Sequence, residues 1–249
     1  MSSTVKILDI FPDPLTADSE IFLKTRKEYS KHLREISGGF ISVEPMPVDK
    51  GMVSIESFYD EAVNTLSILK TIKSLDKGSY DAIIIDCMGD PGLDAAREVT
   101  DIPVLGALES SAHLASIIGD TFGIVGIMDS TGPTYKFAIR KYGLQDKLVG
   151  ISTVNIPVLN IDKDRDKTLS AVLSAIDNLR ALGANAVLLG CTGLTSFVEA
   201  LRKSTDLQVI DPLAAAIGLA VQIKITGVGV SKRVWPYPQK KEFIGGEIW

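Results

Sequence analysis

Cys87 and Cys191 are the two side chains of this sequence best suited to chemistry, because a thiol can serve as nucleophile, metal ligand, acid or base. They are the only cysteines among 249 residues, and His32 and His113 are the only histidines beside them. Two cysteines are too few for a disulfide scaffold, and this set of residues is a poor basis for a metal site. We therefore expect neither a metal nor a cofactor, and the two thiols themselves are the candidates for catalysis.

An internal repeat pairs the two cysteines. The segment Asp81-Ala-Ile-Ile-Ile-Asp-Cys87-Met-Gly89 aligns with Asn185-Ala-Val-Leu-Leu-Gly-Cys191-Thr-Gly193 at a constant offset. After one inserted residue, Asp101-Ile-Pro-Val-Leu aligns with Asp206-Leu-Gln-Val-Ile. Two copies of a unit usually form two similar lobes related by a pseudo-twofold axis.

The elements that must position the cysteines alternate between strand-like and helix-like patterns, which predicts an α/β fold of parallel sheets covered on both faces. We expect two pseudosymmetric lobes, each a mostly parallel sheet flanked by helices, with the active site in the cleft between them. The predicted strands are 5–10, 41–43, 82–85, 122–127, 148–154 and 186–189; the predicted helices are 19–36, one from about residue 54, 132–142 and one around 169–179. Pro12 and Pro14 are expected to end the first strand, and Ala62, Leu66, Leu69 and Ile72 to form one buried helix face.

Each cysteine follows a short apolar strand and precedes a glycine and a helical segment. Ligands of open α/β sheets bind outside the carboxyl ends of the strands. Two facing lobes would therefore put Cys87 and Cys191 on opposite walls of one cleft. The following helix N-terminus is expected to lower the pKa of each thiol from its usual value of about 8.5.

Two thiols that face each other across a cleft suit one type of reaction. If one thiolate removes a proton from a carbon and the opposite thiol returns a proton to the other face, the configuration inverts without a cofactor. Backbone donors after Cys87 and Cys191 would stabilise the carbanion that forms. Taken singly, a cysteine at the end of a buried strand is most often a small core residue, but the equivalent positions favour a paired role. A structural disulfide is the remaining alternative, and intracellular proteins rarely contain one.

Composition excludes several other classes of protein. With 45% hydrophobic and 23% charged residues, the chain resembles an ordinary globular protein. The net charge of −5, without a cluster of Lys and Arg, argues against a nucleic-acid partner. No apolar run approaches the ~18 residues of a membrane span, and the N-terminus does not have the pattern of a signal peptide. These features predict a cytoplasmic protein that binds a small molecule and neither nucleic acid nor membrane.

Several segments resemble the hydantoin racemases of the aspartate/glutamate racemase superfamily. Cys87-Met-Gly-Asp-Pro-Gly-Leu-Asp-Ala-Ala-Arg-Glu98 is similar to the first cysteine motif of that family, and Gly190-Cys191-Thr-Gly-Leu194 is similar to the second. Ser54-Ile-Glu-Ser-Phe-Tyr-Asp-Glu-Ala62 and the tail residues Ser231-Lys-Arg are similar to other family segments. The resemblance thus extends over nearly the whole chain.

This resemblance implies a cofactor-independent racemase in which Cys87 and Cys191 are the two acid/base thiols. The substrates of the family are 5-substituted hydantoins or allantoin, whose ring carbonyls acidify the stereocentre. Backbone groups of Met88, Gly89, Thr192 and Gly193 match positions that hold the substrate in relatives. Glu109 also falls on a characteristic acidic position, where its alternative role is that of a helix-start residue.

The chain departs from the family pattern at two places. The first strand of the family typically ends in Asn-Pro-Asn, but here the residues are Phe11-Pro12-Asp13. The usual Gly-Pro before the Ser54 segment is Gly51-Met52. Both changes make the pocket more apolar, so Phe11 is predicted to contact the substrate, and a bulky hydrophobic 5-substituent is expected.

Two other functions remain open at this point. The same cleft would suit an isomerase or decarboxylase of a dicarboxylic acid, or a protein that binds a small metabolite without turnover. The predicted lobes are residues 1–109 with 214–249, and residues 110–213, and residues 231–249 are expected to form an extended arm on the surface. We also expect a homo-oligomer.

Overall fold

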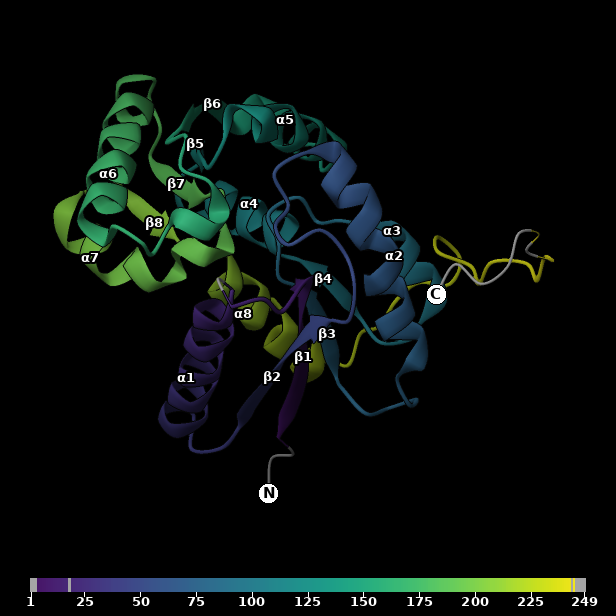
Figure 1. The fold of residues 1–249 in the computed structure, drawn as a ribbon. Helices are drawn as coiled ribbons and strands as arrows, with labels where there is room; N and C mark the ends of the chain where they lie inside the picture. Colours follow the sequence, from purple (N-terminus) through teal and green to yellow (C-terminus); the bar gives the residue numbers. More distant parts are fainter. Residues whose placement is uncertain (1–3, 18, 243, 245–249) are drawn as a thin grey trace.

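The computed structural model describes residues 4–17, 19–242 and 244, and within them eight strands form two parallel sheets (Figure 1). The first sheet has the order β2-β1-β3-β4, and the second has the order β6-β5-β7-β8. The strands of the first sheet are β1 (Val5–Pro14), β2 (Ile41–Val48), β3 (Ala82–Ile85) and β4 (Val104–Gly106). Those of the second are β5 (Phe122–Gly126), β6 (Leu148–Thr153), β7 (Ala186–Leu189) and β8 (Gln208–Ile210). The identical strand order confirms the predicted α/β fold with two similar halves.

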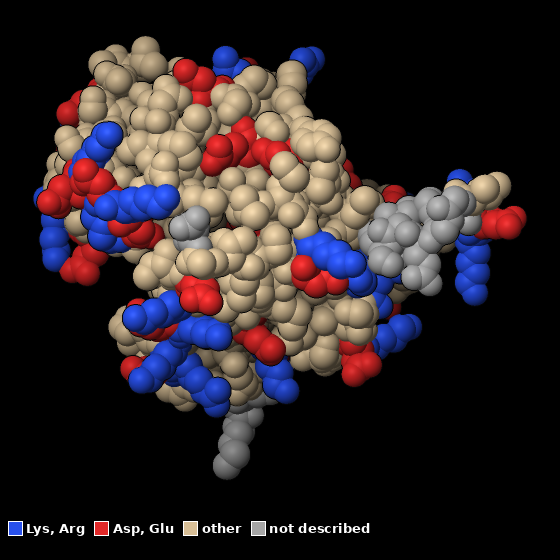
Figure 2. All heavy atoms as spheres, viewed as in Figure 1, with Lys and Arg blue, Asp and Glu red and all other residues tan. Residues whose placement is uncertain are grey.

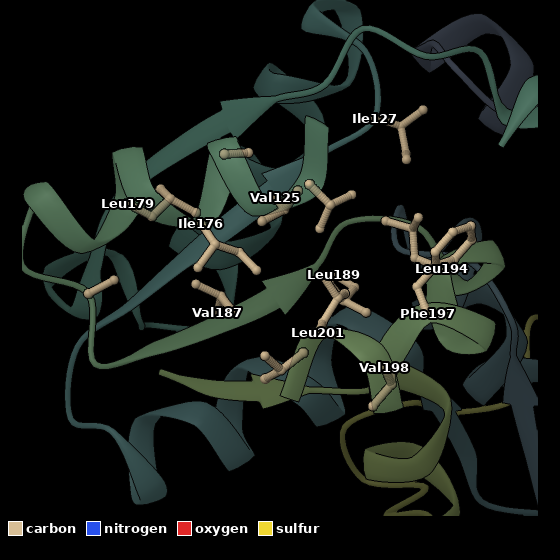
Figure 3. Close-up of a cluster of buried hydrophobic side chains, with 14 of the residues drawn as sticks. Val125, Ile127, Ile176, Leu179, Val187, Leu189, Leu194, Phe197, Val198 and Leu201 are labelled. Carbon is tan, nitrogen blue, oxygen red and sulfur yellow. The ribbon is translucent and has the colours of Figure 1, made fainter. Parts of the chain in front are cut away.

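Helices cover both faces of each sheet. They are α1 (Glu20–Ile36), α2 (Phe58–Ser74), α3 (Leu93–Val99), α4 (Ala107–Ile118), α5 (Gly132–Lys141), α6 (Arg165–Ala181), α7 (Val198–Ser204) and α8 (Pro212–Thr226). Figure 3 shows how the second sheet is covered: Ile176 of α6 and Leu201 of α7 lie against Leu189 and its neighbours. On the first sheet, Ile68 of α2 and Ala96 of α3 bury the corresponding face. The all-apolar strands β3 and β7 are fully buried because both of their faces are covered.

Two helices cross over between the halves. Helix α4 follows β4 of the first sheet, yet its Leu108 and Ala112 pack in a core with Phe122 of β5. Helix α8 follows β8 of the second sheet, yet its Leu213 packs with Ile7 of the first. Helices α4 and α8 also contact each other, so the two halves interlock along the chain. The predicted residue boundaries of the lobes stay a prediction.

The helices that cross over begin at carboxylate caps. Asp90 accepts hydrogen bonds from the backbone N–H of Leu108 at 2.9 Å and of Glu109 at 2.8 Å, and thereby caps α4 from a separate loop. Gly106 precedes this helix, and a Cβ there would lie 2.3 Å from the Asp90 carboxyl carbon. Only glycine fits at a backbone position that a carboxylate approaches so closely. In the second half, the residue that aligns with Gly106 is Asp211, which caps α8 with its own side chain.

The first two strands are longer than predicted. Strand β1 continues through Pro12 and Pro14, and β2 continues through Pro45 and Pro47. Beyond Ile10, β1 pairs only with β2, and β2 is the outer strand of its sheet. A proline there removes no required ladder hydrogen bond, so the prediction that Pro12 and Pro14 end the strand was wrong.

The long helix of the first half begins later than predicted, and its buried face matches the predicted one only in part. Helix α2 begins at Phe58, with Ser57 as its N-cap, and not near Ser54. Its buried residues are Asn64, Ile68 and Ile72, whereas Leu66 is 41% exposed and Ala62 is also exposed. The prediction was right for Ile72, which is buried, and for Leu69, which packs against the core, but wrong for Ala62 and Leu66, and it omitted the buried amide of Asn64.

The surface carries mixed charges, and the C-terminal tail has no regular structure. Figure 2 shows Lys and Arg interspersed with Asp and Glu over α1, where Lys24 pairs with Glu28 and Lys31 with Glu35. Residues 231–242 form no helix or strand, and Lys232 donates to three backbone carbonyls at the end of α3. Positions 243 and 245–249 of the predicted arm lie outside the described residues. Within the described part of the chain, no helix is both long enough and apolar enough to cross a membrane.

Candidate active site

Strands β3 and β7 bring the two cysteines to equivalent places. Cys87 lies two residues after Ile85, the end of β3, and Cys191 lies two residues after Leu189, the end of β7. Both cysteines are free thiols. Strand β3 lies next to β1 in the first sheet, and β7 lies next to β5 in the second, so the two strands occupy equivalent positions. Both cysteines follow the carboxyl ends of these strands.

Both thiols line one cleft, whose empty space is about 620 Å³ when the open solvent at its mouth is included. All five residues predicted to bind the substrate line this cleft as well: Phe11, Met88, Gly89, Thr192 and Gly193. Met88 is only 2% exposed and belongs to the core beneath α4. The geometry therefore brings every predicted site residue together, while their roles in binding and catalysis stay predictions.

Burial dominates the environment of the thiols. The backbone N–H of Gly89 donates to Cys87 Sγ at 3.4 Å, and that of Gly193 donates to Cys191 Sγ at 3.3 Å. Burial nevertheless raises the pKa of Cys191 to about 12, against the opposing effects of this hydrogen bond and of Arg26. Burial also raises the pKa of Cys87 well above its usual value. The expected lowering of both pKa values was therefore wrong, because one N–H donor per sulfur does not compensate for desolvation.

Two carboxylic acids in the cleft were not predicted as site residues. Burial raises the pKa of Asp13 to about 7 and that of Glu61 to about 7. A Cβ on Gly89 would lie 2.2 Å from a Glu61 carboxyl oxygen, so this acid lies directly against the Cys87 loop and would have to shift if Gly89 carried a side chain. Both acids lie in segments singled out for other reasons: Asp13 in Phe11-Pro12-Asp13 and Glu61 in the family-like segment 54–62. Their place in these segments could have indicated Asp13 and Glu61 as site residues, but only the fold shows that both acids line the cleft.

A buried ion pair links the loops of the two cysteines. Arg26 of α1 donates from Nε to Asp86 Oδ2 at 2.6 Å and from Nη2 to the carbonyl oxygen of Thr192 at 2.7 Å. Asp86 precedes Cys87 and Thr192 follows Cys191. Sequence analysis missed Arg26 because nothing in an isolated helix 60 residues before Asp86 indicates this contact.

The second half contributes hydroxyl groups that were also missed. Thr131, Thr134 and Tyr135 line the cleft. Tyr135 donates to the carbonyl oxygen of Gly190 at 2.6 Å, directly before Cys191. These side chains come from the start of α5, whose sequence carries no recognisable signal for a site.

The segment 49–57, here called the strap, crosses from the first half to the second. Its Glu56 accepts a hydrogen bond from the backbone N–H of Val158 at 2.7 Å, and its backbone carbonyl accepts one from Ser130 at 2.7 Å. Ile55 and Ser57 of the strap line the cleft, as does Val158 opposite them. The strap therefore forms part of the cleft wall and ties the two halves together.

Glu109 lies outside the cleft. It is in the first turn of α4 and forms an ion pair with Arg97. Of its two alternative roles, the structure supports that of a helix-start residue. Within the part of the chain that is described, no cluster of three or more His, Cys, Asp or Glu is arranged to hold a metal ion.

Comparison with known proteins identifies the family. The sequence model of a family described as Asp/Glu/Hydantoin racemase matches residues 31–220. A hydantoin racemase from Pseudomonas sp. (strain NS671) is 36% identical over 199 residues, which are 78% of this chain and 79% of that protein. The chain belongs to the Asp/Glu/Hydantoin racemase family. The predicted resemblance is thereby confirmed, and the protein is a racemase of the Asp/Glu racemase superfamily.

Solved structures agree with this racemase fold. An allantoin racemase from Klebsiella pneumoniae is 26% identical and superposes with a TM-score of 0.84 over 97% of both chains. A maleate isomerase from Pseudomonas putida S16 has a TM-score of 0.66 over 91% of this chain and 94% of its own, at 12% identity. At that identity the second likeness concerns the fold alone.

Proposed function

We propose that this racemase inverts the stereocentre of 5-substituted hydantoins, or of a closely related cyclic amino-acid derivative, by proton transfer between Cys87 and Cys191. The observation that carries this proposal is the pair of free thiols, from equivalent strand ends, in the wall of one cleft. The hydantoin and allantoin racemases to which the chain is similar support the same class of substrate.

In the proposed cycle one cysteine is a thiolate and the other a thiol. The thiolate removes the proton from the stereogenic carbon, and the thiol donates a proton to the opposite face, so the two sulfur atoms exchange protonation states. Their raised pKa values make each thiolate a stronger base, which matches the weak acidity of a C–H bond better than an ordinary thiolate would. The N–H groups of Gly89 and Gly193 stabilise whichever sulfur carries the charge.

The polar groups of the cleft favour a neutral cyclic substrate over a dicarboxylate. Among the described residues that line the cleft there is no Lys, Arg or His, whereas Asp13, Glu61 and Asp86 are present. A dicarboxylic acid would meet Asp13 and Glu61 without a cation to balance its charge, because the nearby cation, Arg26, is already paired with Asp86. A ring with N–H and C=O groups can instead donate to a carboxylate or accept from a protonated acid or from Thr134. The backbone of Met88, Gly89, Thr192 and Gly193 is proposed to contact the same ring.

Cytoplasmic location is part of the proposal. Acid and base catalysis by Cys87 and Cys191 requires both sulfur atoms to stay reduced, and the cytosol keeps thiols in that form. Turnover without a metal or cofactor, and assembly into a homo-oligomer, remain predictions that the purified protein can test directly.

The decisive experiment is hydrogen exchange at the stereocentre. Wild-type protein is incubated with each enantiomer of 5-benzylhydantoin in deuterated water, and deuterium incorporation and racemisation are followed by NMR and chiral chromatography. Cys87→Ser and Cys191→Ser should each lose racemisation by about 100-fold or more, because a hydroxyl is a far poorer base than a thiolate. The surface variant Ser116→Ala on α4 is the control and should keep wild-type rates.

Two outcomes would contradict the proposal. Wild-type racemisation by either cysteine variant would exclude the two-thiol mechanism. If the ligand raises the melting temperature of the wild-type protein but no exchange occurs, the protein binds the metabolite without turnover.

A further inference from the structure

We propose that Arg26 is a positioning residue of this racemase: its guanidinium holds the two cysteine loops at a fixed separation and makes Cys191 the more reactive thiol of the unliganded protein. This inference rests on the proposed two-thiol function. Arg26 does not line the cleft, so it acts through the loops and not on the substrate.

The first step of the argument is the geometry of the tie. The Arg26 side chain is 2% exposed. Its guanidinium donates two hydrogen bonds to the Asp86 carboxylate, at 2.6 and 3.4 Å, and one to the Thr192 carbonyl oxygen at 2.7 Å. Asp86 is bonded covalently to Cys87, and Thr192 to Cys191. One rigid planar group therefore spans the residues next to both sulfur-bearing positions.

A direct hydrogen bond also connects the two cysteine loops. Thr192 Oγ1 donates to the backbone carbonyl of Asp86 at 3.2 Å, with both residues buried. Proton transfer depends steeply on distance, and a misplacement of about 1 Å can cost about 100-fold in rate. The separation of two thiols on different loops is thus set by Arg26, Asp86 and Thr192 together.

The second step is the unequal charge around the two thiols. The repeat places Asp86 before Cys87 but Gly190 before Cys191, so an acid is present on one side only. Arg26 neutralises this acid and extends its positive charge to the Cys191 loop. On the Cys87 side the Glu61 carboxylate lies against Gly89.

Charged and titratable groups around the thiols follow the same asymmetry. Asp86 and Asp13 add to the rise in the pKa of Cys191 and Arg26 opposes it, whereas Asp13 and Glu61 add to the rise in the pKa of Cys87. Burial raises the pKa of Tyr135, which therefore faces both thiols as a neutral group. The groups that face the thiols or Arg26 are Asp9 and Asp13 of β1, Arg26 of α1, Glu61 of α2, Asp86 after β3, Tyr135 of α5 and Asp211 before α8.

A test of the charge effect needs no substrate. The full-length protein is treated with iodoacetamide at pH 8, and the labelling rate of each cysteine is measured by peptide mass spectrometry. Arg26→Met removes the cation alone, so Asp86 and Asp13 then raise the pKa of Cys191 unopposed by it, and circular dichroism checks that the variant is folded. Labelling of Cys191 should slow relative to Cys87 by about tenfold, which corresponds to about one pKa unit.

Arg202→Met is the matched control. Arg202 is an exposed arginine that donates to the Val209 carbonyl and does not line the cleft, so its loss should leave the labelling ratio unchanged. If Arg26→Met changes the labelling rates of both cysteines by the same factor, or changes neither, the charge role of Arg26 is wrong. The same conclusion follows if Cys87 is the faster-labelled thiol in the wild-type protein.

A second variant tests the geometry separately. Arg26→Lys keeps the positive charge, but a single ammonium group cannot form the fork that reaches both loops. We expect the labelling ratio of the wild type, together with a kcat for racemisation reduced by about tenfold or more and a KM changed by less than about threefold. A loss confined to KM would overturn the positioning role. Absence of hydantoin racemisation in the wild type would overturn the proposed function, while the labelling result would still decide the charge effect.

Discussion

At the scale of single residues, burial changes the chemistry of the groups in the cleft. A thiol after a strand and before a helical segment is expected to be acidic, yet burial raises the pKa of both Cys87 and Cys191. Helix α3 begins only at Leu93, so its N-terminus lies well beyond Cys87 in the chain. The same desolvation raises the pKa values of Asp13 and Glu61, so the cleft holds two acids that ionise near neutral pH.

Asp13 should make the stability of the protein depend on pH. Its pKa is about 7 when folded, against a usual value of 3.8, so only the unfolded chain is ionised between these two pH values. The unfolding free energy should therefore be highest below pH 4 with respect to this group, and fall as pH rises through 7. Asp13→Asn keeps an oxygen that can accept from Asn64 and should remove this pH dependence. The difference in unfolding free energy between the variant and the wild type should therefore be more favourable to the variant at pH 8 than at pH 4, on the order of 2–4 kcal/mol.

Urea unfolding of the wild type and of Asp13→Asn at pH 4 and pH 8 measures this difference. Asp49→Asn is the control, because Asp49 is exposed and Lys70 lowers its pKa. Parallel pH profiles for the wild type and Asp13→Asn would show that the carboxyl of Asp13 ionises normally in the folded protein.

At the scale of elements, the strap explains why α2 begins where it does. The Asn64 side chain accepts the Met52 N–H at 2.6 Å and donates to the carbonyls of Met52 and Pro12, each at 3.0 Å. These bonds hold residues before Ser57 in a non-helical path across the cleft. Residues 54–57 therefore form cleft wall, although their composition permits a helix.

The strap should contribute to substrate binding more than to the chemical step. Glu56→Ala removes the acceptor of the Val158 N–H and loosens the contact between the strap and the second half. We expect KM for a hydantoin to rise by about three- to tenfold, consistent with the loss of about 1 kcal/mol from one hydrogen bond, with kcat changed less. Steady-state racemisation assays by polarimetry measure both constants. Glu199→Ala, an exposed acid on α7, should leave both constants at wild-type values, and a fall confined to kcat in Glu56→Ala would contradict the role in binding.

At the scale of the whole molecule, the cleft exists because two parallel sheets present their carboxyl ends to each other. The exchange of α4 and α8 between the halves joins them, and the Arg26 tie and the strap close the space between their loops. The apolar part of the resulting wall comes from both halves: Phe11, Phe22 and Ile55 from the first, and Ile127 and Val158 from the second.

This wall predicts an order of substrates. Hydantoins with an aromatic or aliphatic 5-substituent should be racemised faster than allantoin, whose 5-substituent is polar and would lose its hydrogen bonds to water against Phe11 and Ile55. Burying an added apolar group of this size is worth about 1–3 kcal/mol, so kcat/KM should differ by about 10- to 100-fold. Chiral chromatography of the separate enantiomers gives the ranking. Faster racemisation of allantoin would show that the substituent does not contact this apolar wall.

The sequence by itself determined the α/β class, the two similar halves and the pairing of Cys87 with Cys191. These follow from local hydrophobic patterns and from a repeat that places each cysteine after a short buried strand. Family-like segments around both cysteines were also sufficient to predict the racemase family. Such information is local or self-similar, so it can be recognised without knowing which elements meet.

Only the tertiary structure decided which other groups surround the thiols and how acidic they are. Arg26 meets Asp86 and Thr192, and Glu56 meets Val158, across sequence separations of 60, 166 and 102 residues. The pKa values of Asp13 and of the thiols depend on desolvation, which arises only when both halves enclose the cleft. A one-dimensional pattern carries neither the distance between such groups nor the amount of water around them, and these two quantities set the charge of the site.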